Sequence, residues 1–347
     1  MMRVAMLEAP RRVFLRQVPM PSVRDGCVRI RIAACGICGT DVGLFEGYHR
    51  TALPYSLGHE YVGSIVEVGE GVRRFSPGQR VVVDPNAHCG HCDFCRRGQV
   101  HLCKNRATAR YQSNGGLAEY TVVSTNIVHH LPECVPFTDG ACAEPLSCAL
   151  HALDRARFDP GDSAAILGAG TMGLLMLQLL RMRGAGAIVV TEPRELRRER
   201  AAQLDASRVL NPLEDDVVAG VRSVAGDGVD LVVECSGRAD VVRQALQLVK
   251  RGGTLLLVGL GMAAQEISLA PAALVANEVT IVGSILNPFA FSRAVELLRE
   301  KRVRVSDLIT PFGLDQVVDA IKAVRDGCVI KGVVVNPGTG TGMARVR

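Results

Sequence analysis

The chain has 347 residues, of which 48% are hydrophobic, so it is long enough for two domains with substantial cores. Its net charge is only +5 and its basic residues are dispersed, which argues against nucleic-acid binding. No long apolar segment occurs at the N-terminus or elsewhere, so we expect neither a secretion signal nor a membrane span. Twelve cysteines without such a signal favour reduced thiols, bound metal and a cytoplasmic location.

Residues 1–150 predict an irregular β domain. Their apolar segments are short and are separated by Gly, Pro and Asp, which is typical of strands joined by turns. The clearest segments read CVRIRIAA, YVGSIVEVG, QRVVVDP and AEYTVVS. This domain also contains a cysteine-rich lobe at about residues 85–104.

Four cysteines of that lobe lie in the sequence CGHCDFCRRGQVHLC. Two gaps of two residues and one of seven allow the four thiolates to meet at one tetrahedral centre. A closed cage of four sulfurs suits a structural Zn²⁺ ion, because it leaves no ligand position for a substrate. A ferredoxin-type cluster is disfavoured, because its last gap is shorter and its final cysteine precedes proline. The predicted ligands are Cys89, Cys92, Cys95 and Cys103.

Residues 151–287 alternate between strand-like and helix-like segments. The candidates for buried strands read SAAILGAG, AIVVTE, VDLVVECSG, GGTLLLVGL and VTIVGS. This alternation predicts a doubly wound parallel sheet, so we assign the chain to the α/β class, with an additional irregular β domain. Residues 288–347 end in another strand candidate, KGVVVNP, and we expect them to return to the first domain. The tail at 338–347 lacks an apolar pattern and is expected to fray.

A glycine-rich turn follows the first predicted strand of the second domain. Gly168, Gly170 and Gly173 form the pattern G-x-G-x-x-G, and Thr171 and Met172 lie between the last two glycines. Glycines at these positions allow the backbone to approach a pyrophosphate, whose charge is stabilised by the N-terminus of the following helix. The turn therefore predicts a dinucleotide-binding site formed by these five residues.

A carboxylate at the end of the next predicted strand bears on the choice of dinucleotide. Glu192 lies about 20 residues after the glycines, where a carboxylate accepts hydrogen bonds from the ribose of NAD. The same charge repels the 2′-phosphate of NADP, so NAD is favoured over NADP. Arg194 and Arg197 follow closely and weaken this preference, and Arg197 is a further candidate cofactor-binding residue.

Three other motifs, CGICGTD, LGHE and CAEPLSCALH, provide a second set of metal ligands. Together they contain a thiolate, an imidazole and two carboxylates, enough for a zinc site with an exchangeable position. A metal of this kind lowers the pKa of an alcohol oxygen, so that the alcohol can release hydride to a nicotinamide cofactor. The residues concerned are Cys38, His59, Glu60 and Glu144.

These motifs, with GAGTMG, VVECSG and GGTLLLVG, resemble those of the zinc-dependent medium-chain dehydrogenase/reductase superfamily as far as about Pro337. The chain is most similar to the branch that contains the polyol (sorbitol and arabinitol) and threonine dehydrogenases. The resemblance implies a GroES-like catalytic domain with a catalytic and a structural zinc ion, and a Rossmann domain that binds NAD. It also implies a homotetramer or homodimer.

The resemblance assigns roles to particular residues. The residues implied at the catalytic zinc are Cys38, His59 and Glu60. Glu144 matches a position that either binds the zinc ion or holds its water molecule, and Asp41 matches a carboxylate that orients the histidine ligand. Thr40 matches the hydroxyl that accepts the substrate proton.

Two positions depart from the family pattern. Where the family often has a histidine that completes the proton relay, this chain has Gly43; either His49 replaces it, or the proton leaves through ribose and water. Where sorbitol dehydrogenases have an Arg-Tyr pair that contacts the polyol, this chain has Leu286 and Asn287. The second departure disfavours sorbitol and points to another polyol, a cyclitol or an amino alcohol.

Three hypotheses for the function follow. The first is an NAD- and zinc-dependent dehydrogenase that interconverts a secondary alcohol and its ketone; the second is a threonine 3-dehydrogenase-like enzyme acting on a β-hydroxy amino acid. The third is a non-catalytic scaffold that binds zinc and a dinucleotide.

The cysteines without ligand spacing are expected to be small buried hydrophobic residues. They are Cys27, Cys35, Cys134, Cys142, Cys148, Cys235 and Cys328.

Overall fold

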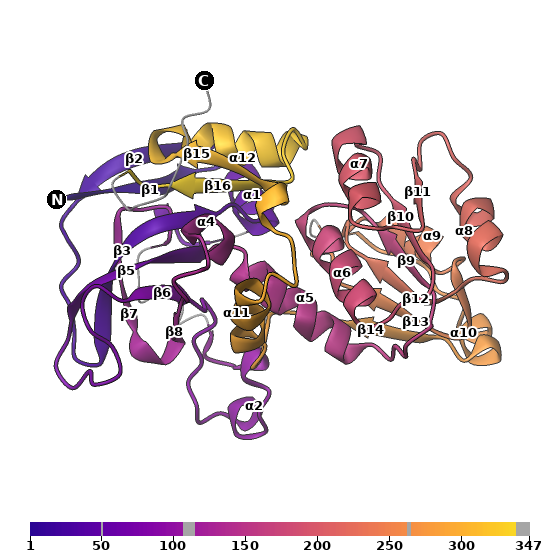
Figure 1. Cartoon of the computed structure of the whole chain (residues 1–347), viewed down its shortest axis with the longest axis horizontal. Coiled ribbons are helices and arrows are strands. Elements are labelled where there is room, and N and C mark those ends of the chain that lie inside the picture. The colour runs from indigo at the N-terminus through magenta and orange to yellow at the C-terminus, as the bar shows by residue number, and fades with distance from the viewer. Residues whose placement is uncertain (50, 107–114, 262–264, 338–347) are drawn as a thin grey trace. The chain divides into compact units, whose positions relative to one another are not determined.

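The computed structural model describes residues 1–49, 51–106, 115–261 and 265–337, which form two compact units (Figure 1). The first unit combines the residues up to Ser147 with those from Pro288 onward, and the second comprises Cys148–Asn287. The predicted fraying of residues 338–347 lies outside the described residues. None of the helices in the described ranges has the length and apolar character needed to cross a membrane.

The second unit is built on a parallel sheet. Its described strands are β9 (Ala164–Leu167), β10 (Ile188–Thr191), β11 (Arg208–Leu210), β12 (Val229–Glu234), β13 (Val249–Leu257) and β14 (Thr280–Gly283). They lie in the order β11-β10-β9-β12-β13-β14, and every neighbouring pair is parallel. The chain moves outward from β9 in one direction and then crosses to β12 on its other side. The carboxyl ends of β9 and β12 therefore form the topological switch point at which such sheets bind ligands.

One helix precedes the first strand of this sheet, and the others connect its strands. They are α5 (Ala143–Arg155), which begins in the first unit, α6 (Thr171–Met182), α7 (Glu195–Gln203), α8 (Val217–Ala225), α9 (Ala239–Ala245) and α10 (Pro271–Asn277). Every residue of β9 and β10 is buried, which explains why these strands are continuous apolar runs rather than alternating ones. Because crossover connections are right-handed, helices flank both faces of the sheet. The prediction of a doubly wound α/β domain is confirmed.

The first unit is mainly β structure. Its described strands are β1 (Met2–Ala9), β2 (Arg12–Val18), β3 (Cys27–Gly36), β4 (Tyr55–Ser56), β5 (Glu60–Val68), β6 (Arg80–Val83), β7 (Tyr120–Ser124), β8 (Val128–His130), β15 (Ile309–Gly313) and β16 (Lys331–Val335). They form a small sheet of order β2-β1-β4 and a larger one of order β15-β16-β3-β5-β6-β8, in which β7 also pairs with β3. Most of these pairs are antiparallel, as expected for short strands joined by turns.

Short helices lie between the strands of the first unit. The α-helices are α1 (Gly39–Glu46), α2 (Asp93–Arg96), α4 (Phe137–Gly140), α11 (Phe291–Arg299) and α12 (Val317–Asp326). The 3₁₀-helices are η1 (Val100–Leu102), η2 (Thr125–Ile127), η3 (Ser306–Leu308) and η4 (Leu314–Gln316). Of these elements, α1, α2 and η1 adjoin cysteines of the two candidate metal centres.

The last strands of the chain complete the larger sheet of the first unit. β16 pairs with β15 on one side and with β3 on the other, where Val333 lies opposite Gly36. On its far side β3 pairs with β5, where Gly36 lies opposite Glu60. This register brings the beginning of β16 close to the beginning of β5.

The prediction that the remaining cysteines are buried is wrong for most of them. Only Cys35 and Cys142 among the seven are buried; Cys27, Cys148 and Cys235 are half-buried, and Cys134 and Cys328 are exposed. Both exposed cysteines lie in connections, one between β8 and α4 and the other between α12 and β16. Surface connections expose their side chains whatever the residue type, so cysteine's average preference for the core does not decide these positions.

Candidate metal centres and dinucleotide site

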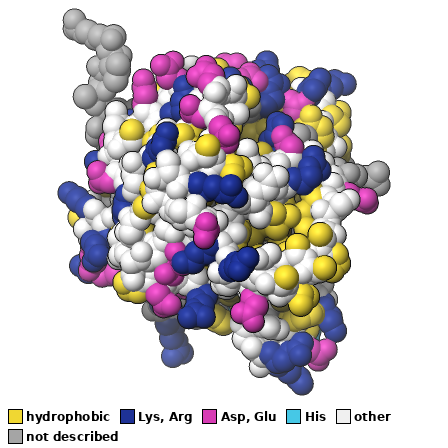
Figure 2. Space-filling model, turned by 90° about the vertical axis from the view of Figure 1, so that its right-hand side faces the viewer, with side chains coloured by type: hydrophobic (Ala, Val, Ile, Leu, Met, Phe, Trp, Pro, Cys, Tyr) yellow, Lys and Arg dark blue, Asp and Glu magenta, His cyan; other side chains and the backbone are white. Residues whose placement is uncertain are grey.

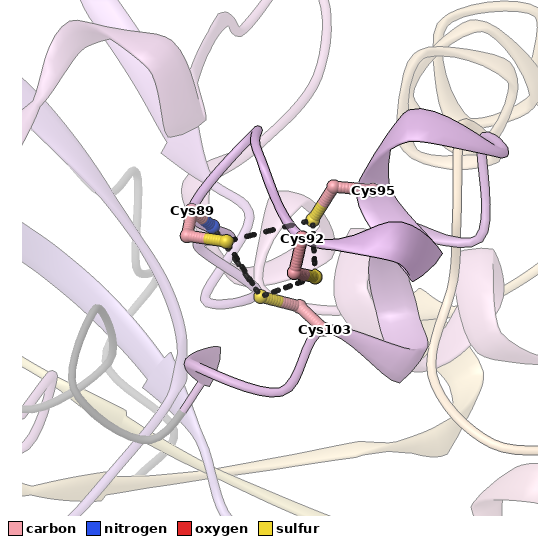
Figure 3. Close-up of side chains that lie close together, drawn as sticks. All are labelled: Cys89, Cys92, Cys95 and Cys103. Atoms are coloured by element: carbon pink, nitrogen blue, oxygen red, sulfur yellow. Dashed lines mark hydrogen bonds between the residues drawn. The ribbon is translucent and has the colours of Figure 1, made fainter.

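The four cysteines of the lobe point toward a common centre (Figure 3). Cys92 precedes α2, Cys95 lies within it, and Cys103 follows η1. Neighbouring sulfur atoms lie 3.5–4.0 Å apart. Zinc–sulfur bonds of about 2.3 Å in a tetrahedron separate the sulfurs by about 3.8 Å, so the cluster fits a zinc ion.

Backbone amides stabilise negative charge on these sulfurs. The amides of Cys89 and Asn105 each lie 3.4 Å from the Cys103 sulfur. Hydrogen bonds from the amides of His91 and Cys92 contribute to lowering the pKa of the Cys89 thiol to about 5. The imidazole of His91 is turned to the backbone carbonyl of Cys89, 2.8 Å away, rather than to the sulfur atoms. The four thiolates thus supply the whole ligand set among the described residues of the lobe.

A second cluster brings together Cys38, His59 and Glu60. The sulfur of Cys38, a ring nitrogen of His59 and a carboxylate oxygen of Glu60 all lie within 4.8 Å of one another. Cys38 is the residue that precedes α1, whereas Glu60 is the first residue of β5. One sulfur, one nitrogen and one oxygen form a donor set that zinc accepts in catalytic sites.

Asp41 organises this second cluster from the first turn of α1. Its carboxylate accepts hydrogen bonds from the backbone amides of Cys38 at 2.9 Å and Gly58 at 3.1 Å, so it ties together the two loops that carry the ligands. It also lies 3.7 Å from Nδ1 of His59, which is an electrostatic contact rather than a short hydrogen bond. Burial alone would lower the pKa of His59, but Asp41 and Cys38 raise it well above its usual value. A site that concentrates negative charge in this way attracts a cation.

Glu144 lies near the cluster without belonging to the compact group. It is the second residue of α5 and is 6% exposed. Burial, reinforced by the charge of Glu60, raises its pKa to about 7, although His59 and Lys331 act in the opposite direction. Its carboxylate oxygens are not among the atoms that lie within 4.8 Å of one another. Of the two predicted carboxylates, Glu60 therefore belongs to the compact group and Glu144 does not.

Lys331, to which the sequence alone assigned no role, is buried next to Glu60. Its side chain is 2% exposed, and its Nζ atom forms an ion pair with the Glu60 carboxylate. Burial would lower the pKa of Lys331, but the charges of Glu60, Cys142 and Cys38 raise it, so the ammonium group remains charged. The two residues are 271 positions apart, and only the strand register reveals their contact.

The glycine-rich turn lies at the switch point of the parallel sheet. Gly168 follows β9 with φ of 100°, a conformation that favours glycine, and Gly170 precedes α6. A Cβ atom on Gly173 would lie 3.0 Å from the carbonyl carbon of Gly168 and would clash with its oxygen, so helix and turn pack without room for a side chain. Thr171 and Met172 begin α6, and the N-terminus of a helix is a position at which a bound anion is stabilised.

Glu192 and Arg197 lie around this turn. The Glu192 carboxylate is buried and accepts hydrogen bonds from the amides of Ala169 at 2.8 Å and Arg194 at 3.0 Å. A guanidinium nitrogen of Arg197 lies 3.9 Å from the position that a Cβ atom on Gly170 would occupy. The structure therefore brings the predicted cofactor residues of this unit together, with Glu192 holding the turn itself.

Sequence reasoning assigned no role to Glu234, which supports the neighbouring loop. This buried residue ends β12, and its carboxylate accepts hydrogen bonds from the amides of Ser236 at 2.6 Å and Gly237 at 2.9 Å. The loop it holds approaches the glycine turn, because the amide of Ser236 would lie 3.5 Å from a Cβ atom on Gly168. The motif VVECSG carried the signal, since a carboxylate before Ser-Gly at a strand end is suited to cap a turn.

Two protein-family models match the chain. The alcohol dehydrogenase GroES-like domain matches residues 24–133, and the zinc-binding dehydrogenase domain matches residues 171–300. The first match lies within the β unit that contains the two metal-ligand clusters, and the second covers most of the parallel-sheet unit. The predicted combination of a GroES-like and a Rossmann domain is thereby confirmed.

Curated relatives and solved structures extend this match over almost the full length. Sorbitol dehydrogenase of Bacillus subtilis is 31% identical over 92% of this chain and 93% of its own length. L-threonine 3-dehydrogenase of Pyrococcus abyssi is 38% identical over 71% of this chain and 72% of its own length. The crystal structure of a zinc-binding dehydrogenase from Sinorhizobium meliloti, bound to NADP, is 34% identical with a TM-score of 0.90, covering 96% of this chain and 99% of that one. The chain therefore belongs to the zinc-dependent medium-chain dehydrogenase/reductase superfamily, in the branch of the polyol and threonine dehydrogenases.

Proposed function

We propose that this dehydrogenase oxidises a secondary alcohol of a polyol, cyclitol or amino alcohol, and reduces the corresponding ketone, with NAD(H) as cofactor. The observation that carries the proposal is the convergence of Cys38, His59 and Glu60 in a chain that also has a complete glycine-rich dinucleotide turn. A closed four-cysteine cage elsewhere in the same unit is suited to a structural ion. The cluster of Cys38, His59 and Glu60, called the mixed cluster below, is therefore the candidate for the catalytic ion.

The residues around the mixed cluster have distinct tasks. When zinc is bound there, it supplies Lewis-acid activation of the alcohol oxygen. Cys38, His59 and one of the carboxylates Glu60 and Glu144 would hold it, and Asp41 keeps Cys38 and His59 in place through the amides it binds. The Thr40 hydroxyl, 3.7 Å from the Cys38 sulfur, is placed to take the proton of the substrate alcohol.

His49 is proposed to receive that proton from Thr40. Position 43 is one helical turn beyond Thr40 on the same face of α1, and it is occupied by glycine. A Cβ atom on Gly43 would lie 2.5 Å from Nε2 of His49, so the imidazole occupies the space that a side chain at position 43 would take. Of the two routes left open by the sequence, this geometry favours the one through His49.

His49→Gln is expected to lower kcat/KM for alcohol oxidation by about tenfold or more at neutral pH, because the amide fills similar space but cannot accept a proton. The loss should shrink as the pH rises, since hydroxide then removes the proton directly. The measurement is a pH profile of kcat/KM for the wild type and the variant. His130→Gln, an exposed histidine of β8, is the control. Equal profiles for wild type and His49→Gln would assign the proton to the ribose-and-water route.

NAD is proposed as the preferred dinucleotide. A buried carboxylate, Glu192, directly follows β10 next to the turn, and a 2′-phosphate beside it would be repelled. Arg194 follows at the start of α7, and the relative from Sinorhizobium meliloti carries NADP, so NADP is the alternative. The ratio of kcat/KM for the two cofactors decides between them: a ratio above one for NAD supports the proposal, and a ratio below one contradicts it.

A substrate panel tests the activity itself. Purified protein with its metal content measured would be incubated with NAD and, in turn, arabinitol, sorbitol, a cyclitol, an amino alcohol and L-threonine, while the absorbance of the reduced cofactor is followed. Oxidation of a polyol, cyclitol or amino alcohol supports the proposal, and a preference for L-threonine favours the threonine-type alternative. No turnover of any member, with one zinc per chain rather than two, would favour the scaffold instead.

We also propose that the protein is a homodimer or homotetramer in which the edge of the parallel sheet faces a second copy. β14 forms that edge, and exposed apolar residues lie next to it, among them Val275 at 79% and Ile285 at 42% exposure. Figure 2 shows hydrophobic side chains gathered on a face of this unit. An unpaired strand with apolar neighbours is suited to pair with another strand.

The double change Val275→Lys with Ile285→Lys is expected to reduce the assembly to a smaller species, because charges placed in an apolar interface lose their hydration. Light scattering coupled to size-exclusion chromatography measures the mass. Leu213→Lys is the matched control, since Leu213 is also 79% exposed but lies beyond β11, at the other end of the sheet. A wild-type monomer, or a double variant of unchanged mass, would contradict the proposed interface.

A further inference from the structure

The turn that carries His49 follows α1 directly and buries little surface of its own. Gly47 comes after the last helical residue with φ of 84°, a conformation that favours glycine. The next two amides, of Tyr48 and His49, donate hydrogen bonds to the carbonyl of Gly43 at 2.8 and 3.2 Å. These bonds return the chain over Gly43, where the imidazole of His49 lies. Gly47 is exposed and Tyr48 is 48% exposed, so burial of the turn does not by itself hold it in place.

Glu46, the last residue of α1, ties this turn to two other elements. Its side chain is 4% exposed, and its two carboxylate oxygens accept hydrogen bonds from different arginines. Arg325 of α12, a helix that packs against α1 (Figure 1), donates through Nη1 at 2.9 Å. Arg11, in the turn between β1 and β2, donates through Nε at 2.6 Å. One carboxylate therefore connects the end of α1 with α12 and with the β1–β2 turn.

The β1–β2 turn is fitted to the end of α1. Arg11 has φ of 61°, a left-handed conformation that costs free energy in a residue other than glycine. Its backbone amide donates a hydrogen bond to the carbonyl of Phe45 at 2.6 Å. A Cβ atom on Gly47 would lie 3.0 Å from Cγ of Pro10, so the two turns are in close contact. The contacts that Arg11 makes with α1 offset the strain of its own backbone.

The Glu46 carboxylate is ionised at neutral pH. The hydrogen bond from Arg325 lowers the pKa of Glu46 most strongly and the one from Arg11 adds to this effect, although burial acts in the opposite direction. Ion pairs on an open surface contribute little, because water and salt screen them, but the Glu46 carboxylate is almost completely covered. A glutamine at this position offers one acceptor oxygen and a donor amide, so it satisfies only one of the two guanidinium groups.

We propose that Glu46 is a positioning residue for proton transfer, because it holds the turn after α1 in the form that keeps the His49 imidazole over Gly43. In this position the imidazole lies one helical turn beyond Thr40, from which it receives the proton. The inference rests on the proposed function, since His49 has a proton to receive only if the protein oxidises an alcohol. Glu46 acts through the turn and not on the substrate.

The first test measures the placement of His49 without turnover. Diethyl pyrocarbonate modifies neutral imidazole rings faster when they are more exposed, and mass spectrometry of the digested protein follows each histidine separately. In Glu46→Gln the modification of His49 should be about fivefold faster, because the turn opens more often. His130, an exposed histidine of β8, should react at the wild-type rate in the same sample. Arg325→Gln leaves the carboxylate and one arginine, and should give a smaller acceleration. An unchanged rate at His49 in both variants would overturn the inference.

The second test follows catalysis. Glu46→Gln should lower kcat/KM for alcohol oxidation by about five- to tenfold at neutral pH, and the loss should shrink as the pH rises, as it should for His49→Gln. In the His49→Gln background the same change should have little further effect, because Glu46 acts through His49. A loss that is equal at every pH, or that adds fully to that of His49→Gln, would give Glu46 a structural role only and overturn the inference.

Glu119→Gln is the matched control. Glu119 is a partly covered carboxylate of the same unit that pairs with Arg3, and this pair ties β1 to the segment before β7. Its loss should leave both the pH profile and the reactivity of His49 as in the wild type. A wild-type protein that oxidised no alcohol would refute the proposed function and the inference with it. With an active wild type, the outcomes for Glu46→Gln decide the inference alone.

Discussion

Cys38→Ala is expected to lower kcat/KM for the alcohol by at least about a thousandfold, or roughly 4 kcal/mol of transition-state stabilisation. The variant lacks the only thiolate among Cys38, His59 and Glu60, so the mixed cluster loses its strongest zinc ligand. The fold should survive, because Asp41 binds the backbone amide of residue 38, which the substitution retains.

Three measurements make this prediction specific. Turnover should collapse, the zinc content should fall by one ion per chain, and NADH should still bind. Because the chain contains no tryptophan, cofactor binding is best followed by the fluorescence of NADH itself or by calorimetry. Cys134→Ala, which removes an exposed cysteine outside both clusters, should behave as wild type. Turnover by Cys38→Ala at a near wild-type rate would exclude this cluster as the catalytic centre.

Cys95→Ala is expected to act on stability rather than on the chemical step. Opening the four-sulfur cage removes metal-binding free energy that contributes to folding of the lobe. A loss of about 2–3 kcal/mol would lower the midpoint of thermal unfolding by roughly 5–10 °C for a unit of this size. The remaining folded protein should keep most of its kcat, because the mixed cluster shares none of the four sulfurs.

Calorimetric unfolding together with metal analysis tests this prediction. Cys328→Ala, another exposed cysteine outside the clusters, is the matched control and should leave both quantities unchanged. A variant that kept two zinc ions and the wild-type unfolding midpoint would show that the cage is not a metal site. Complete loss of turnover in protein that remains folded would contradict the division of labour between the two centres.

Local sequence patterns predicted the parts of the molecule that are formed by neighbouring residues. The four-cysteine lobe and the glycine turn are each set by spacing within a short segment, so their geometry follows from the sequence itself. Continuous apolar runs likewise predicted the buried parallel strands. Motif resemblance, rather than spacing, brought Cys38 together with His59 and Glu60.

Contacts between distant segments could not be predicted in the same way. The pairing of Lys331 with Glu60 depends on how β16 and β5 align against β3, and no local pattern encodes that register. The position of the His49 imidazole over Gly43 depends on how the chain turns after α1. At Gly36 and Gly43 the lack of a side chain leaves room for the side chains of Lys331 and His49, respectively. Which residue fills that room is seen only in the folded chain.

The division of the first unit has a consequence for how the protein is made. Its larger sheet needs β15 and β16 from the end of the chain, whereas the second unit is one uninterrupted segment. During synthesis on the ribosome, the nucleotide-binding half can therefore mature first, while the metal-carrying half waits for its last strands. Until Lys331 emerges, the Glu60 carboxylate lacks the ammonium group with which it pairs, so this buried ion pair is completed only at the end of synthesis.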